Sequence, residues 1–330
     1  MFKRIMSTGL APFQHTTGMG RWILVAGIAI TAVFVIFAVF APWIAPYGFS
    51  QRTDAAGDRF PKMGHPSSDH LLGTNDQFYD ILSRVIWGAR TELSVVLLSV
   101  ILAVVIGVPL GLVSGFLGGW ADRALVFVMD ALYAFPSLLL AIVFAFLLQA
   151  KLGGAGILAA ALSLTAIYIP QYFRVVRSTT VSAREETYVE AARAIGAKPR
   201  TIMGRYLFGN VIQSVPVIGT LNAADAISTL AALGFVGLGI QPDEAAEWGY
   251  DLSRALDDAA AGIWWTTLFP GLAIVLLVTG LTLIGEGLNE TINPALRKRR
   301  IRKVVLTRGS VTEPRPPAEP PRAHEEEVSR

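Results

Sequence analysis

The 330-residue sequence contains no cysteine, which excludes disulfide bonds, thiolate metal sites, iron–sulfur clusters and cysteine nucleophiles. Charged residues make up only 16 % of the chain, against about 25 % in a typical soluble domain. The four histidines lie far apart without metal-binding spacing, and no lysine follows a glycine, so the chain has no phosphate-binding P-loop. These absences argue against an ordinary soluble enzyme.

Apolar residues are abundant, at 53 % of the chain with a mean hydropathy of +0.51. A helix needs about 20 predominantly apolar residues to cross a bilayer. Six stretches are long enough, near 22–42, 93–115, 124–148, 153–172, 211–236 and 263–284. The sequence therefore predicts an all-α polytopic membrane protein with six transmembrane helices. The first stretch exceeds the apolar core of a signal peptide, which favours an uncleaved anchor over a cleaved signal.

The placement of basic residues predicts the orientation of these helices. If the N-terminus is inside, most of the 28 Lys and Arg residues fall in cytoplasmic segments, so both termini are expected in the cytoplasm. The expected organisation is a cytoplasmic arm (1–21), a first transmembrane helix (22–42), an extracytoplasmic segment (43–92), a five-helix core (93–296) and a cytoplasmic tail (297–330). The tail is basic and then proline-rich, which predicts disorder. Within 43–92, the apolar spacing of residues 81–86 predicts an interfacial helix.

The expected cytoplasmic loop 173–210 has strong helix formers and many charges, with a turn expected at Gly196. Two short helices are predicted there, at about 180–195 and 199–208. The run Glu190-Ala191-Ala192, followed by Gly196, resembles the EAA loop of ABC importer permeases. Small alanine side chains let another protein approach closely, and a glutamate offers a charge to a basic partner. The alternative is an amphipathic helix lying solvated on the membrane surface.

Further motifs resemble the C-type membrane subunit of dipeptide, oligopeptide and nickel transporters. They include Gly73-Thr74, Phe135-Pro136, Gly237-Leu238-Gly239, Trp248-Gly249, Phe269-Pro270-Gly271 and Asn293-Pro294, and the resemblance covers roughly 66–296. Two departures stand out: Phe208-Gly209 replaces a Leu-Pro pair, and Leu230 stands where the family often has glutamate. The resemblance implies a type I ABC importer permease in the bacterial cytoplasmic (inner) membrane. Such a pore subunit moves dipeptides or oligopeptides by alternating access.

The same resemblance implies a division of labour among several chains. The expected partners are a second homologous permease subunit, two ABC ATPase subunits, an extracytoplasmic substrate-binding protein and membrane lipid, with no nucleic acid. Mg-ATP would be bound and hydrolysed on the ATPase subunits, and this chain is expected to hold no cofactor or metal and to be no enzyme. The residues expected to dock onto the ATPases are Glu190, Ala191, Ala192 and Gly196.

Polar residues within the spans are candidates for the transport pathway. These are Asp130, Asn222, Asp225 and Ser228, because an acid at mid-membrane costs about 2.5–3.5 kcal/mol unless it faces protein or water. Hydrogen bonding between helices is the alternative for each. The acidic extracytoplasmic segment 237–262 carries candidate contacts to a binding protein at Trp248, Tyr250 and Asp251. The alternative there is a solvated charged face.

Other functions stay open at this point. Similar permeases carry nickel chelates, glutathione or sugars in place of dipeptides. A more distant alternative is a stand-alone, ion-coupled secondary transporter with Asp130 and Asp225 as ion carriers, although the two halves show no convincing internal repeat. A membrane enzyme would need clustered ligands or an acid–base pair in the spans, and the sequence shows neither.

Overall fold

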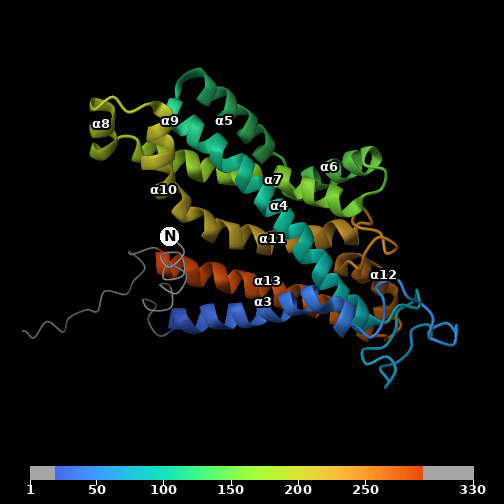
Figure 1. Ribbon diagram of the computed structural model, residues 1–330. Helices are drawn as coiled ribbons and strands as arrows, with labels where there is room; N and C mark the ends of the chain where they lie inside the picture. The colour runs from blue at the N-terminus through green and yellow to red at the C-terminus, as the bar shows by residue number, and fades with distance from the viewer. Residues whose placement is uncertain (1–18, 293–330) are drawn as a thin grey trace, which may run out of the picture. The chain divides into compact units, whose positions relative to one another are not determined.

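The computed structural model describes residues 19–292, and the predicted tail 297–330 and most of the predicted arm 1–21 lie outside that range. Within it, five helical stretches are long and apolar enough to cross a membrane. They are α3 (Met19–Ile44), α4 (Ile81–Leu117), α7 (Gly156–Ala183), the stretch 199–235 that ends in α11 (Val215–Phe235), and α13 (Trp265–Ile292) (Figure 1). The described residues contain no named β-strand, only two isolated bridges. The predicted all-α membrane fold is confirmed.

The predicted third span, 124–148, is not one straight helix. It forms α5 (Gly119–Ala134) and α6 (Ser137–Lys151), which meet at 97°. Phe135 and Pro136 between them are extended, with ψ of 141° and 125°. Proline has no N–H and disfavours the helical region for the preceding residue, and here Phe135 is extended and the helix breaks. Counted as one broken span, the pair brings the number of candidate spans among the described residues to six.

The second span is longer than predicted and absorbs the expected interfacial helix. Helix α4 starts at Ile81, where the Asp80 carboxylate accepts a hydrogen bond from the Ser83 N–H at 2.8 Å. Its 37 residues extend over about 55 Å, well beyond the roughly 30 Å of a bilayer's apolar interior. The separate helix predicted at 81–86 is therefore wrong, because Val85 and Ile86 are buried in the core rather than lying at an interface.

A stripe of glycines joins α4 to α7. Gly107, Gly111 and Gly115 lie four residues apart on one face of α4, and a Cβ atom on Gly111 would lie only 2.6 Å from the backbone oxygen of Phe173. Small residues at this spacing let two membrane helices approach closely enough for backbone-to-backbone packing. The spacing was visible in the sequence, but its partner helix was not.

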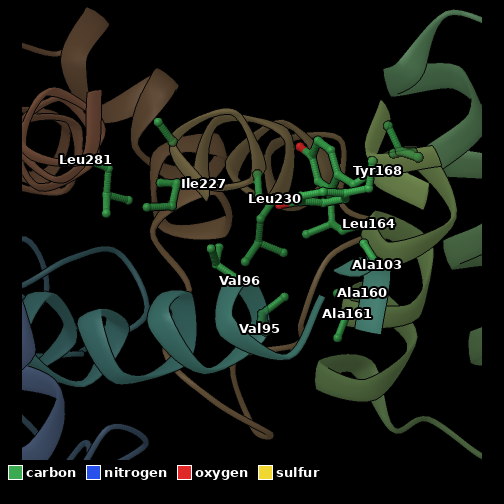
Figure 2. Close-up of a cluster of buried hydrophobic side chains, with 14 of the residues drawn as sticks. Val95, Val96, Ala103, Ala160, Ala161, Leu164, Tyr168, Ile227, Leu230 and Leu281 are labelled. Carbon is green, nitrogen blue, oxygen red and sulfur yellow. The ribbon is translucent and has the colours of Figure 1, made fainter. Parts of the chain in front are cut away.

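The apolar core lies where α4, α7 and α11 meet (Figure 2). Val95, Val96 and Ala103 come from α4, Ala160, Ala161, Leu164 and Tyr168 from α7, and Ile227 and Leu230 from α11. Leu281 of α13 borders this cluster, while α3 packs along α13 and α4. Helix α3 leaves large apolar side chains such as Phe40 47 % exposed, as expected for a helix that faces lipid.

Candidate functional site

The segment that resembles an EAA loop forms a short helix standing at one end of the long helices (Figure 1). The predicted helix 180–195 is interrupted, because α7 ends at Ala183 and α8 (Thr187–Ala194) begins after a turn. The turn is anchored by Arg184, whose guanidinium donates to the Gly115 carbonyl of α4 at 2.9 Å. Helix α8 ends at Gly196, whose φ of +79° is a conformation that glycine adopts without strain. The predicted turn at Gly196 is confirmed.

The two faces of α8 have different surroundings. Val189 and Ala192 are buried, at 0 % and 2 % exposure, and belong to the apolar core. Glu190, Ala191 and Gly196 are exposed. The side chain of Ala192 therefore packs inward, whereas Glu190, Ala191 and Gly196 are open to a partner, and docking at these four residues stays a prediction. Sequence reasoning missed Ile195, which is 79 % exposed at the end of α8, and an aliphatic side chain beside the terminating glycine was the available signal.

The second predicted short helix, 199–208, does not end where expected. From α9 (Pro199–Thr201) the chain continues through a π-helical turn (Ile202–Leu207) and α10 (Phe208–Val211) into α11 without leaving helical conformation. The Phe208-Gly209 pair is therefore helical and makes no turn. Asn210 also donates a hydrogen bond to the Tyr188 hydroxyl at 2.7 Å. The exposed helix α8 is thus tied directly to the start of a membrane-spanning helix.

A polar cavity opens beside the break between α5 and α6. Its volume is about 210 Å³, and its lining residues are Leu132, Tyr133, Phe135, Ser137, Leu140, Ile167, Gln171 and Asp225. Asp225 is exposed and accepts a hydrogen bond from the buried Tyr168 hydroxyl at 2.8 Å. An acid within a span must face water or protein, and here the acid faces this cavity.

Asp130 of α5 is not among the residues that line the cavity, and it has a partner. Its carboxylate pairs with Arg174 at 3.2 Å, with the two side chains 59 % and 53 % exposed. The same guanidinium lies 4.2 Å from the centroid of the Tyr133 ring, which lines the cavity. A cation and an aromatic ring at that distance attract each other. Charges of both signs therefore flank the cavity.

The other two predicted pathway residues have different positions. Ser228 is exposed and donates to the Ala224 carbonyl of its own helix at 3.4 Å. Asn222 is only 5 % exposed and its side-chain nitrogen has no hydrogen-bond partner among the described residues. The rotation of α11 turns Asn222 toward the core, so it does not line this cavity, and its place on a transport pathway stays a prediction.

The expected binding-protein contacts are mostly internal. Trp248, at the start of α12 (Trp248–Ala260), is fully buried and donates from its indole nitrogen to the Val85 carbonyl at 3.2 Å. Asp251 is 7 % exposed and receives a bidentate pair from Arg84 at 2.7–3.1 Å. Neither side chain reaches the surface of this chain, and contact of either with a binding protein stays a prediction. Tyr250 is half-buried, and its hydroxyl accepts from Gln77 at 3.1 Å.

The sequence analysis did not predict a buried pair of acidic side chains. Glu92 of α4 and Glu247 are both fully buried, and their carboxyl groups lie next to each other. Burial raises the pKa of Glu247 to about 7, although the backbone N–H groups of Gly249 and Tyr250 donate to it at 2.7 and 2.6 Å and favour the charged form.

No group of three or more His, Asp or Glu residues in the described range 19–292 is arranged to hold a metal ion. The candidate site therefore consists of an exposed helix at one end and a polar cavity beside a broken span. Neither arrangement brings together a nucleophile and a base.

Comparison with known families agrees with this architecture. Residues 107–298 match the family described as binding-protein-dependent transport system inner membrane component. Residues 21–61 match the N-terminal transmembrane domain of oligopeptide transport permease C. Together the two matches cover α3 from residue 21 onward and every later membrane helix except residues 81–106, the larger part of α4.

Individual relatives extend over most of the chain. The dipeptide transport system permease protein DppC of Escherichia coli K12 is 39 % identical over 88 % of this chain and 95 % of its own length. DppC of Alkalihalophilus pseudofirmus is 34 % identical over 83 % of this chain and 86 % of its own length. The glutathione transport system permease protein GsiD of Shigella flexneri is 36 % identical over 80 % of this chain and 84 % of its own length.

A solved structure shares the fold. A chain of the MetNI methionine ABC transporter, in an inward-facing conformation, superimposes with a TM-score of 0.52 at 19 % identity. The superposition covers 64 % of this chain and 96 % of that chain. At that identity the likeness concerns the arrangement of helices alone.

Proposed function

Because the chain belongs to the family of binding-protein-dependent transport system inner membrane components, we propose that it is the pore subunit of an ATP-driven importer for dipeptides and other short peptides. The relatives of dipeptide and glutathione systems, which match over most of its length, support a short peptide as cargo. Glutathione is itself a tripeptide, so both relatives are named for cargo of one chemical class. The chain is a multi-pass membrane protein, and we place it in the bacterial inner membrane.

The observation that supports this function best is the exposed helix α8. It presents Glu190, Ala191 and Ile195 to its surroundings while Val189 anchors it in the core. A partner that binds this face would push on the helix 199–235, because the two are joined through Asn210 and Tyr188. Helix α8 is therefore suited to carry a displacement from an ATPase into a spanning helix.

The chain itself would supply the path, and other chains the energy. Two ABC ATPase subunits would bind α8 on this chain and its counterpart on a second homologous permease, with Mg-ATP held on the ATPases. A substrate-binding protein would deliver peptide at the opposite end, where segment 45–80 and α12 meet the start of α4. Both termini and α8 would then lie in the cytoplasm, as the distribution of basic residues favours.

Movement of α8 would change which end of the bundle is open. The broken span α5–α6 borders the polar cavity, and a break at proline gives helices a place to change their angle. Alternating exposure of this cavity to the two sides of the membrane would move a bound peptide across without chemistry on this chain.

Affinity purification in mild detergent tests the assembly. The tagged chain, extracted from native membranes, should copurify with P-loop ATPases, a second six-span permease and a binding protein. Replacing Ile195 with aspartate should remove the ATPases and keep the second permease. Recovery of the wild-type chain alone, under conditions that keep known transporters intact, would contradict the proposal.

Reconstitution tests the cargo. The complete complex in proteoliposomes, supplied with the binding protein and ATP, should accumulate radiolabelled dipeptide against its gradient. Glutathione should be tested in parallel, since a relative is named for it. Uptake that follows an imposed ion gradient without ATP would favour a secondary transporter instead.

A further inference from the structure

Asp225 lines the polar cavity and Arg174 lies against Tyr133, another lining residue, so a charge of each sign is available to the two ends of a short peptide. We propose that Asp225 binds the peptide's α-amino group and that Arg174 binds its carboxylate during passage through the pore. This inference rests on the proposed function and adds to it a binding site with an assigned ligand chemistry. At about 210 Å³, the cavity is smaller than the roughly 300–1,000 Å³ of pockets for drug-sized ligands, which favours a small cargo.

The surroundings of the Asp225 carboxylate favour the binding of a cation. The Tyr168 hydroxyl, 2.8 Å away, fixes one carboxylate oxygen while the side chain stays open to the cavity. Tyr168 is itself fully buried among the residues shown in Figure 2, so it cannot swing away with its partner. No arginine, lysine or histidine pairs with Asp225 within the described residues. An ammonium group entering the cavity would supply the missing countercharge.

Arg174 is placed to receive the opposite end. It is exposed, and only the single contact to Asp130 at 3.2 Å and the ring of Tyr133 hold it in position. An exposed ion pair of this kind is worth about 0–1 kcal/mol, so a carboxylate can exchange for Asp130 at little cost. The planar guanidinium would keep its stacking on Tyr133 while it turns a pair of N–H groups to the new carboxylate.

Helix α7 sets the spacing between the two charges. Tyr168, which donates to Asp225, and Arg174 are six positions apart on this helix, about 9 Å along its axis between their Cα atoms. Gln171 lies between them in the chain and lines the cavity, where its amide can contact a peptide group. An extended chain advances about 3.3–3.6 Å per residue, so a dipeptide or tripeptide has a length of the same order.

The site recognises only what all short peptides share. Ammonium, peptide group and carboxylate each have a contact, and apart from Ser137 the rest of the lining is apolar or aromatic. Side chains of the cargo would therefore project away from the charged groups. The arrangement suits a pore that moves peptides of varied sequence but limited length.

The experiment measures uptake in proteoliposomes containing the whole transporter with its binding protein and ATPases. We expect Asp225→Asn and Arg174→Gln each to lower the kcat/KM for alanyl-alanine uptake at least tenfold, while Asp225→Glu recovers most of it. ATP hydrolysis stimulated by the loaded binding protein should stay within twofold of wild type, because α8 is untouched. Glu286→Gln, which removes an exposed carboxylate of α13 away from the cavity, serves as the matched control and should transport normally.

The possible results separate the two proposals. If the wild-type complex imports no peptide, the proposed function fails. If wild type imports alanyl-alanine and Asp225→Asn does so equally well, the cavity assignment fails while the function stands. Should Asp225→Asn not assemble, Tyr168→Phe tests the same site, since it frees the carboxylate without removing it and should raise KM. A normal KM in that variant would overturn the assignment.

Discussion

The buried ion pair between Arg84 and Asp251 should make a large, measurable contribution to the coupling of α12 to α4. The two side chains are 2 % and 6 % exposed, and their nitrogen and oxygen atoms lie 2.7–3.1 Å apart in three contacts. Removing one partner of such a pair leaves a buried charge without compensation, which costs about 3–5 kcal/mol. Replacing both partners with apolar residues of similar size is often close to neutral.

We therefore expect Asp251→Ala to lower the free energy of unfolding by about 3–5 kcal/mol, because it strands the Arg84 guanidinium. The loss of unfolding free energy in Asp251→Ala should be greater than the loss in the double variant Arg84→Met/Asp251→Leu. At roughly 2–4 °C per kcal/mol for a chain of this size class, the single variant should unfold at least about 6 °C below wild type. The assay is thermal unfolding in detergent followed by tryptophan fluorescence, since Trp248 adjoins Asp251 in α12.

Arg254→Ala provides the control, because Arg254 is an exposed arginine on the same helix and should change stability by less than about 0.5 kcal/mol. The reasoning would be refuted in either of two ways. One is a loss below 1 kcal/mol for Asp251→Ala. The other concerns the double variant Arg84→Met/Asp251→Leu. If its loss of unfolding free energy equals the sum of the losses of Arg84→Met and Asp251→Leu, the two side chains are not coupled.

Three further predictions concern other parts of the molecule. Gly111→Val should prevent the packing of α4 against α7, since its Cβ would lie 2.6 Å from a backbone oxygen. Gly219→Ala should be tolerated, because its Cβ would lie 3.5 Å from the nearest atom. Gel filtration in detergent distinguishes the two variants. Burial raises the pKa of Glu247 to about 7, so the free energy of unfolding of wild type should fall by about 3 kcal/mol relative to that of Glu247→Gln as pH rises from 4.5 to 8. Denaturation measured across this pH range tests it, and a difference between the two proteins that does not change with pH would contradict it. Ile195→Asp should leave thermal stability unchanged, since the side chain is 79 % exposed, while reducing ATPase copurification.

Local features of the sequence predicted most of the architecture. The mean hydropathy of a stretch depends only on residues that are neighbours in the chain, so the apolar runs predict where the membrane-spanning stretches lie and in what order. Pro136 and Gly196 act through their own backbone geometry, and the chain bends or turns at each. The motifs that resemble the permease family can be recognised in the sequence because each is contiguous in the chain.

Burial of individual side chains could not be predicted in the same way. Ala191 and Ala192 are adjacent and chemically identical, yet one is exposed and the other packs into the core. Asn222 and Asp225 are three residues apart on α11, yet only Asp225 reaches the cavity. In each case the outcome depends on how the helix is rotated against its neighbours.

The sequence by itself determined that this chain crosses a membrane in several apolar helices and carries a segment that resembles an EAA loop, since both follow from local composition and contiguous motifs. Only the tertiary structure decided which polar groups meet. Glu92 and Glu247, or Arg84 and Asp251, lie more than 150 positions apart and come together because the close approach of α4, α11 and α12 fixes their rotation and register. Packing of this kind depends on the shape of both partners, which no single stretch of sequence contains.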